Sequence, residues 1–153
     1  MNNTLNNTQK FTYAAGVFFV VLGIVGFIPG IAIAPRITDP MLAVEAAHGR
    51  LFGLFPVNAL LNLLHLALGT WALFAASEAS QARTYCRATA IICGVLMVLG
   101  FVPGLSTFFG LMPLYSHNVW LNALCAAATA YFGYTKLAVR VHTPPGAGTQ
   151  AWT

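Results

Sequence analysis

The chain has 153 residues, of which 58% are hydrophobic and only 7% are charged. Soluble domains carry about 25% charged residues and disordered chains are poor in apolar residues, so the composition excludes both classes. The composition instead predicts a single domain that is embedded in a lipid bilayer. The net charge is +4, but the basic residues are not clustered in the sequence. This distribution excludes a typical nucleic-acid-binding surface. Three cysteines without a CxxC pair give no disulfide framework.

Four apolar segments predict an all-α membrane protein with transmembrane helices at about residues 11–28, 51–76, 85–102 and 119–138. The first segment would be roughly 27 Å long, close to the thickness of the hydrocarbon layer. A signal peptide cleaved after Ala32-Ile33-Ala34 is the competing interpretation. The apolar run is longer than a typical signal-peptide core, so we predict a retained helix. Residues 1–10 are predicted to be a polar tail and residues 139–153 a flexible one, flanking a domain at 11–138.

The loop between the first two predicted helices carries local signals of a short helix of its own. Asp39 is a good N-cap residue and Pro40 would occupy the first helical position. The sequence MLAVEAAH at residues 41–48 could then form two turns, ended by Gly49. We therefore expect a short interfacial helix in this first non-cytoplasmic loop.

The distribution of basic residues predicts the orientation in the membrane. If four helices alternate, one side carries the following five basic residues: Lys10, Arg83, Arg87, Lys136 and Arg140. The other side carries Arg36 and Arg50, offset by Asp39 and Glu45. The positive-inside rule then places both termini in the cytoplasm.

Two stretches of the chain resemble each other and indicate an internal repeat. GFIPG at residues 26–30 matches GFVPG at 100–104, where the first and third predicted helices end. FGLFP at residues 52–56 matches FGLMP at 109–113, before the second and fourth. The order of these matches predicts a four-helix bundle built from two tandem helix pairs, related by an axis normal to the membrane. A purely structural duplication is the favoured reading.

Polar side chains within the apolar segments form two predicted stripes. Asn58, Asn62 and His65 share one helical face, and Asn118 and Asn122 share a face of the fourth segment. If the repeat holds, the two stripes face each other across the bundle. Hydrogen bonding between helices is the favoured role for these residues.

The alternative role is a metal or haem site centred on His65. His48 and His117 are the other candidate ligands, although both fall near the non-cytoplasmic face. Zinc needs about four ligands and a bis-histidine haem needs two deep histidines, whereas only His65 is deep. No cofactor is therefore predicted, and a haem or metal ion remains the alternative.

Catalytic machinery is missing from the sequence. All three carboxylates lie in predicted loops, and the GxSxG, P-loop and dinucleotide motifs are absent. The leading prediction is a non-enzymatic structural or accessory subunit. Its expected partners are the lipid bilayer and a larger membrane complex or further copies of the chain, with no nucleic acid.

Five segments between His48 and Gly133 carry a likeness to a known family: HGRLFGLFPVN (48–58), NLLHL (62–66), LGFVPG (99–104), FGLMPL (109–114) and VWL (119–121). Through these segments the stretch resembles a bacterial family of small four-helix membrane proteins, the domain of unknown function DUF4383. The resemblance implies a multi-pass protein of the bacterial inner membrane and supplies no activity.

At three positions the chain departs from residues that the resemblance would lead one to expect. Family members often carry histidine immediately before the counterpart of Asn62, and Asp-Val-Trp-Leu-His at the fourth helix. Leu61, Asn118 and Asn122 occupy those places here. If the family holds a cofactor through those side chains, the resemblance implies that this chain has lost part of the ligand set.

Overall fold

The computed structural model describes residues 5–135, which form four helices and a small three-stranded sheet. The helices are α1 (Asn7–Val25), α2 (Ala59–Ala75), α3 (Ala79–Phe101) and α4 (His117–Tyr134). By length and composition alone, α1 and α3 could cross a membrane, and α2 is a shorter apolar helix. The predicted tail at residues 139–153 and the end of the fourth predicted helix at 138 lie outside the described residues.

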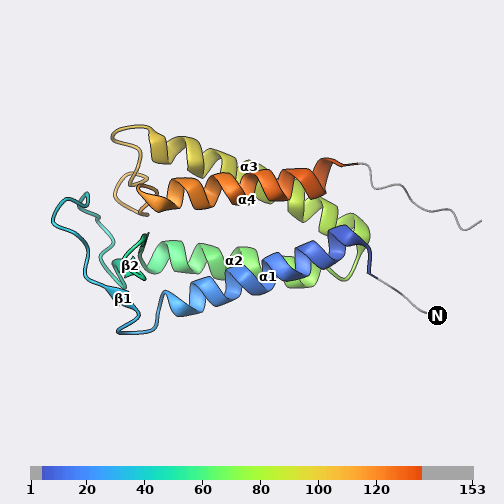
Figure 1. The fold of residues 1–153 in the computed structure, drawn as a ribbon, viewed down its shortest axis with the longest axis horizontal. Helices are drawn as coiled ribbons and strands as arrows, with labels where there is room; N and C mark the ends of the chain where they lie inside the picture. The colour runs from blue at the N-terminus through green and yellow to red at the C-terminus, as the bar shows by residue number, and fades with distance from the viewer. Residues whose placement is uncertain (1–4, 136–153) are drawn as a thin grey trace, which may run out of the picture.

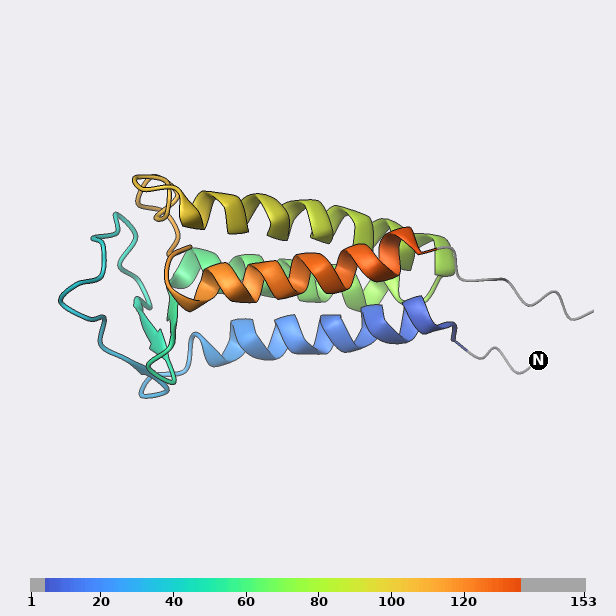
Figure 2. The same cartoon turned by 45° about the horizontal axis from the view of Figure 1, so that its top comes forward.

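The helices are arranged as two antiparallel hairpins that lie side by side (Figures 1 and 2). Helix α1 packs closely along α2, and α3 along α4, with far fewer contacts between the two pairs. Both connections within the hairpins lie at one end of the molecule (Figure 1). The start of α1, the α2–α3 turn and the end of α4 lie at the other end (Figure 1). We call these the loop end and the terminus end.

Helix α1 begins four residues earlier than the sequence predicts, so residues 7–10 do not belong to the polar tail. Asn6 and Gln9 form a capping box, in which each side chain accepts a hydrogen bond from the other residue's backbone N–H. Two otherwise unpaired N–H groups are satisfied in this way, and the helix can start within a polar sequence. The Gln9 amide also donates to the carbonyl of Ala76, which ties α1 to the end of α2.

The predicted second helix is wrong over its first eight residues. Strands β1 (Ala32–Ile33), β2 (Gly49–Leu51) and β3 (Phe55–Val57) form an antiparallel sheet in that order. Phe52 and Gly53 both have positive φ and turn the chain between β2 and β3, which stops a helix there. Pro56 lies in β3, an edge strand, where its missing N–H costs no ladder bond.

The predicted interfacial helix at residues 41–48 is also wrong. The N–H groups of Ala43 and Val44 donate to the carbonyl of Gly110 in the α3–α4 loop, at 2.8 and 3.3 Å. The carbonyl of Ala46 accepts from Ala59 at the start of α2. Because these backbone groups bond outside their own segment, residues 41–48 form no helix, and the N–H of His48 closes only a single turn with the carbonyl of Glu45. The carboxylate of Asp39, the expected cap, pairs with Arg50 instead.

Candidate functional site

Asn58 joins the two hairpins at the loop end. Its side-chain oxygen accepts from the N–H of Leu61 and so caps α2, as expected for asparagine at this position. Its amide nitrogen donates to the carbonyl of Val44 at 3.0 Å and to that of Leu111 at 2.7 Å. The side chain is fully buried. One residue therefore fixes the first turn of α2, the first loop and the α3–α4 loop together.

Asn118 makes the reciprocal connection from the second hairpin. Its amide nitrogen donates to the carbonyl of Pro56 in β3 and to that of Pro113, both at 2.6 Å. Each hairpin thus supplies an asparagine that bonds to a loop carbonyl of the other. We call Asn58, Asn118 and the four carbonyls that they reach the asparagine clasp.

The matched segments of the two hairpins share an unusual backbone conformation. Gly30 and Gly104 have φ of 88° and 85°, in the two GF-x-PG segments. In the two FGL segments, the phenylalanines have φ of 52° and 58°, and the glycines have φ of 72° and 84°. Positive φ is rare outside glycine, so its recurrence at matched phenylalanines is a specific structural likeness.

A buried ion pair between Arg50 and Asp39 lies beside the clasp. Their side chains are 3% and 5% exposed, and both the Nε and the Nη2 of Arg50 donate to the carboxylate. Nη1 donates to the carbonyl of Leu54 and to the hydroxyl of Ser116, so the guanidinium bridges the hairpins. The sequence reasoning counted these charges only for topology, because no local pattern joins residues 11 positions apart.

The ion pair shifts the ionisation of both partners. The Arg50 guanidinium, as hydrogen-bond donor, holds the pKa of Asp39 below its ordinary value, against an opposing effect of burial. The same bonds raise the pKa of Arg50. At Tyr115, whose ring centroid lies 6.0 Å from the guanidinium carbon, burial raises the pKa to about 12. All three groups therefore keep a fixed charge state at neutral pH.

Two residues of the predicted polar stripe, Asn62 and His65, contact the first hairpin rather than α4. The Asn62 amide lies against Gly26, the residue that follows α1. A Cβ added at Gly26 would be only 2.1 Å from the Oδ1 of Asn62. The His65 ring stacks on Phe19 of α1, with ring centroids 5.7 Å apart. Both side chains are buried, whereas Asn122 on α4 is half-buried. Asn62 and His65 therefore belong to the packing inside the first hairpin.

The three candidate cofactor ligands lie in different elements. His65 is in the middle of α2, His48 immediately precedes β2, and His117 is the first residue of α4, with its Nδ1 3.2 Å from the hydroxyl of Ser116. Between residues 5 and 135, no three His, Cys, Asp or Glu side chains come close enough to share a metal ion. The Nδ1 of His65 is buried without a hydrogen-bond partner, yet its neighbour is a phenyl ring rather than a second ligand. Within the described part of the chain, the structure therefore does not bring the three candidate histidines together in one metal cluster.

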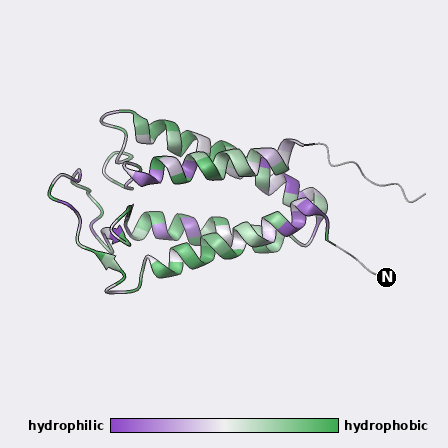
Figure 3. Ribbon diagram, in the orientation of Figure 1, coloured by the Kyte–Doolittle hydropathy of each residue, from purple (hydrophilic) through white to green (hydrophobic). Residues whose placement is uncertain are grey.

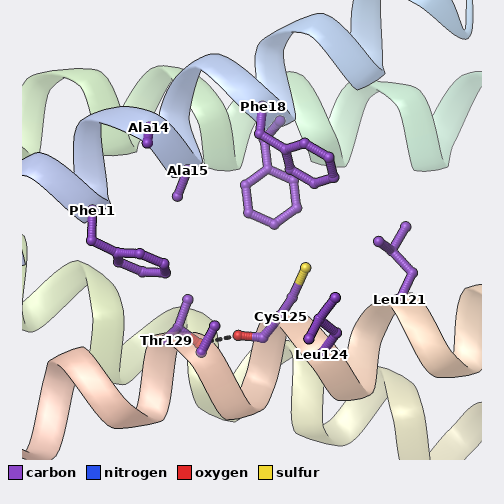
Figure 4. Close-up of a pocket in the computed structure, with 10 residues that line it drawn as sticks. Phe11, Ala14, Ala15, Phe18, Leu121, Leu124, Cys125 and Thr129 are labelled. Carbon is purple, nitrogen blue, oxygen red and sulfur yellow. Dashed lines mark hydrogen bonds between the residues drawn. The ribbon is translucent and has the colours of Figure 1, made fainter.

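An apolar groove separates the hairpins where α1 faces α4, with a volume of about 240 Å³ (Figure 4). The side chains along it include Phe11, Ala15, Phe18, Leu121, Leu124 and Cys125. The hydroxyl of Thr129, the most polar group in the wall, donates to the carbonyl of Cys125 in its own helix (Figure 4). Sequence reasoning missed this groove, because its alanines and phenylalanines resemble any other lipid-facing or core positions.

Comparison with known proteins gives one result. A family model described as a domain of unknown function (DUF4383) matches residues 9–135, which includes the whole stretch from His48 to Gly133. No curated protein and no solved structure matches the chain significantly.

Proposed function

Because the chain belongs to the DUF4383 family, a domain of unknown function, we propose its function from its own geometry. It is a multi-pass protein of the bacterial inner membrane, in which all four helices span the bilayer. Its role is non-enzymatic, as a structural or accessory subunit.

The apolar outer surface of the helices carries this proposal. One large side chain from each helix, Ile24, Leu63, Ile91 and Leu124, is between 50% and 68% exposed. Apolar residues cover most of the length of all four helices (Figure 3). A soluble monomer rarely exposes contiguous apolar patches beyond a few hundred Å². Contact with the hydrocarbon layer of a membrane would explain these exposed apolar side chains. At about 1.5 Å per residue, the helices are roughly 26–35 Å long, which suits a bilayer.

The charged groups of the described residues support the same orientation that the sequence predicts. At the terminus end, Lys10, Arg83 and Arg87 outnumber Glu78, whereas basic and acidic residues balance at the loop end. Under the positive-inside rule, the terminus end faces the cytoplasm. Lys136 and Arg140, which the sequence count also used, lie outside the described residues.

We also infer that the two hairpins are tandem repeats. The reciprocal bonds of the asparagine clasp and the shared positive φ values in matched segments support this inference. Asn58 and Asn118 each donate to a carbonyl of the other hairpin, Asn58 from the N-cap of α2 and Asn118 from the second position of α4.

Reporter fusions test the topology. Green fluorescent protein fused after residue 153, or inserted after residue 78, should fluoresce, because it folds in the cytoplasm. Alkaline phosphatase inserted after residue 37, in the first loop, should be active, since it needs an oxidising compartment. The reverse pattern would overturn the orientation, and release of the untagged protein by alkaline carbonate would overturn membrane insertion.

The accessory role predicts how the chain behaves on purification from its native host in mild detergent. We expect the chain to elute with a larger complex, without a Soret band or stoichiometric metal, since His65 packs on Phe19 and no cluster of three metal-binding side chains is found between residues 5 and 135. A Soret band that His65→Ala removes, with His48→Ala as the matched control, would instead make this a cofactor protein.

A further inference from the structure

We propose that Cys93 of α3 and Cys125 of α4 are a dithiol pair, which a quinone oxidises to a reversible disulfide bond. The bond ties the two helices of the second hairpin together near their middle. The pairing of the two cysteines stands on the packing of this hairpin, whereas the class of the oxidant rests on the proposed membrane insertion.

Helices α3 and α4 approach each other closely at two levels. Toward the terminus end, a Cβ added at Gly133 of α4 would lie 3.0 Å from the backbone N of Arg87 in α3. Toward the loop end, a Cβ added at Gly100 of α3 would lie 2.8 Å from the Cγ2 of Val119 in α4. These two contacts fix the register of the antiparallel pair on both sides of its middle.

Cys93 and Cys125 lie at the same level between these contacts. Along α3, Cys93 is six residues past Arg87, and along α4, which runs the other way, Cys125 is eight residues before Gly133. Cys125 packs against the buried cluster that contains Cys93, and one thiol donates a hydrogen bond to the other. Two thiols in a hydrogen bond need only a small movement to reach about 2.05 Å, the sulfur–sulfur distance of a disulfide.

The surroundings of the pair favour a disulfide over a metal ion. Cys93 is 2% exposed and shares its buried cluster with Phe19 and Leu68. A metal ion held by thiolates would bring charge into these apolar surroundings, which is costly without further ligands. Between residues 5 and 135, no third His, Cys, Asp or Glu side chain completes such a cluster. A disulfide is neutral and needs no third partner.

The groove between α1 and α4 gives the pair a route to the hydrocarbon layer. The thiol of Cys125 points into this groove, whose wall is mostly apolar (Figure 4). Quinones dissolve in hydrocarbon and accept two electrons together with two protons, so they can reach a thiol there. The oxidant needs only to meet Cys125 and not to stay bound. Cys93, the buried partner, then resolves the oxidised thiol, as in other accessible cysteines placed beside a second one.

The quinone alone balances the oxidation. The two S–H bonds break and one S–S bond forms. Two electrons and two protons pass to the two carbonyl oxygens of the quinone, which becomes a hydroquinone. A dithiol reductant reverses the step by thiol–disulfide exchange.

Counting the thiols of the full chain, in dodecylmaltoside and without oxygen, tests the pair. Duroquinone is the probe, because its fully methylated ring accepts electrons and hinders the addition of thiols. After denaturation, N-ethylmaleimide should label three cysteines in the untreated chain and only Cys86 in the oxidised chain. The intact mass should fall by the mass of two hydrogen atoms, and a chymotryptic digest should yield Cys93 linked to Cys125. Dithiothreitol should restore all three thiols.

Cys86→Ala is the matched control, because it removes a cysteine of the same helix whose sulfur lies 3.4 Å from the hydroxyl oxygen of Thr12 instead. This variant should still lose two thiols on oxidation, whereas Cys93→Ala and Cys125→Ala should each lose none. The proposal is wrong if the unmodified chain keeps three thiols, if Cys86 enters the link, or if the link joins two copies of the chain.

Alkaline carbonate extraction of membranes that contain the chain separates this proposal from the previous one. If the chain stays in the membrane and duroquinone leaves its three thiols intact, only the dithiol pair is wrong. If carbonate releases the chain, the proposed membrane function is wrong, and with it the class of the oxidant, whether or not the disulfide forms.

Discussion

Arg50→Ala is expected to lower the free energy of unfolding by about 3 kcal/mol, because it leaves the Asp39 carboxylate buried without its partner. The loss also removes the two bonds that Nη1 makes to Leu54 and Ser116, so the hairpins separate more easily at the loop end. Unfolding of the full chain by sodium dodecyl sulfate in mixed micelles, followed by circular dichroism, measures the change.

Controls on Asp39 separate the charge pairing from the packing of the arginine stem. Arg50→Met with Asp39→Leu should recover most of the lost stability, since replacing both partners by apolar residues is often neutral. The lowered pKa of Asp39 means that its stabilising effect is complete above its ordinary pKa of 3.8 and is lost as the pH falls through the lower folded value. Asp39→Asn should abolish that acid sensitivity. A chain equally stable with and without Arg50 would contradict the proposed bridge between hairpins.

Gly69→Ala is expected to destabilise the first hairpin by about 2 kcal/mol, the usual cost of overpacking. An added Cβ would lie 2.6 Å from the backbone N of Val20 and 2.9 Å from the carbonyl O of Gly16, both in α1. These are backbone atoms, so relief requires α1 and α2 to move apart. The detergent-unfolding midpoint of the full chain should fall accordingly.

Gly94→Ala is the matched control in α3, where an added Cβ meets nothing within 4 Å. Alanine is favoured over glycine in a helix interior by about 0.5–1 kcal/mol, so this variant should be as stable as the original chain or more so. If Gly69→Ala and Gly94→Ala had the same effect, α1 and α2 would not pack as closely as described.

The four helices could be predicted because long apolar runs need only local information. The connections could not, because their hydrogen bonds join distant residues. Asp39-Pro40 has the local pattern of a helix start, yet its carboxylate pairs with Arg50. Pro56 suits a first helical turn as well as an edge strand, and the positive φ of Phe52 and Gly53 decides between them.

The candidate site was predicted in part. Periodicity placed Asn58 and Asn62 on one face, but it could not show that Asn58 would cap α2 and reach Leu111, while Asn62 would turn to Gly26. For the α1–α4 groove the sequence carries no signal. Small and aromatic residues such as Ala15 and Phe11 form a groove only because two particular helices stand beside each other.

The asparagine clasp affects the order in which parts of the chain can fold during synthesis. Asn58 leaves the ribosome 53 residues before Leu111, the second carbonyl that its amide requires. Until then the first hairpin can offer it only the carbonyl of Val44. Likewise, the carbonyl of Pro56 has no hydrogen bond from Asn118 until Asn118 has been synthesised. We therefore expect the first hairpin to form as an incomplete folding intermediate, whose loop end becomes fixed only when α4 has been synthesised.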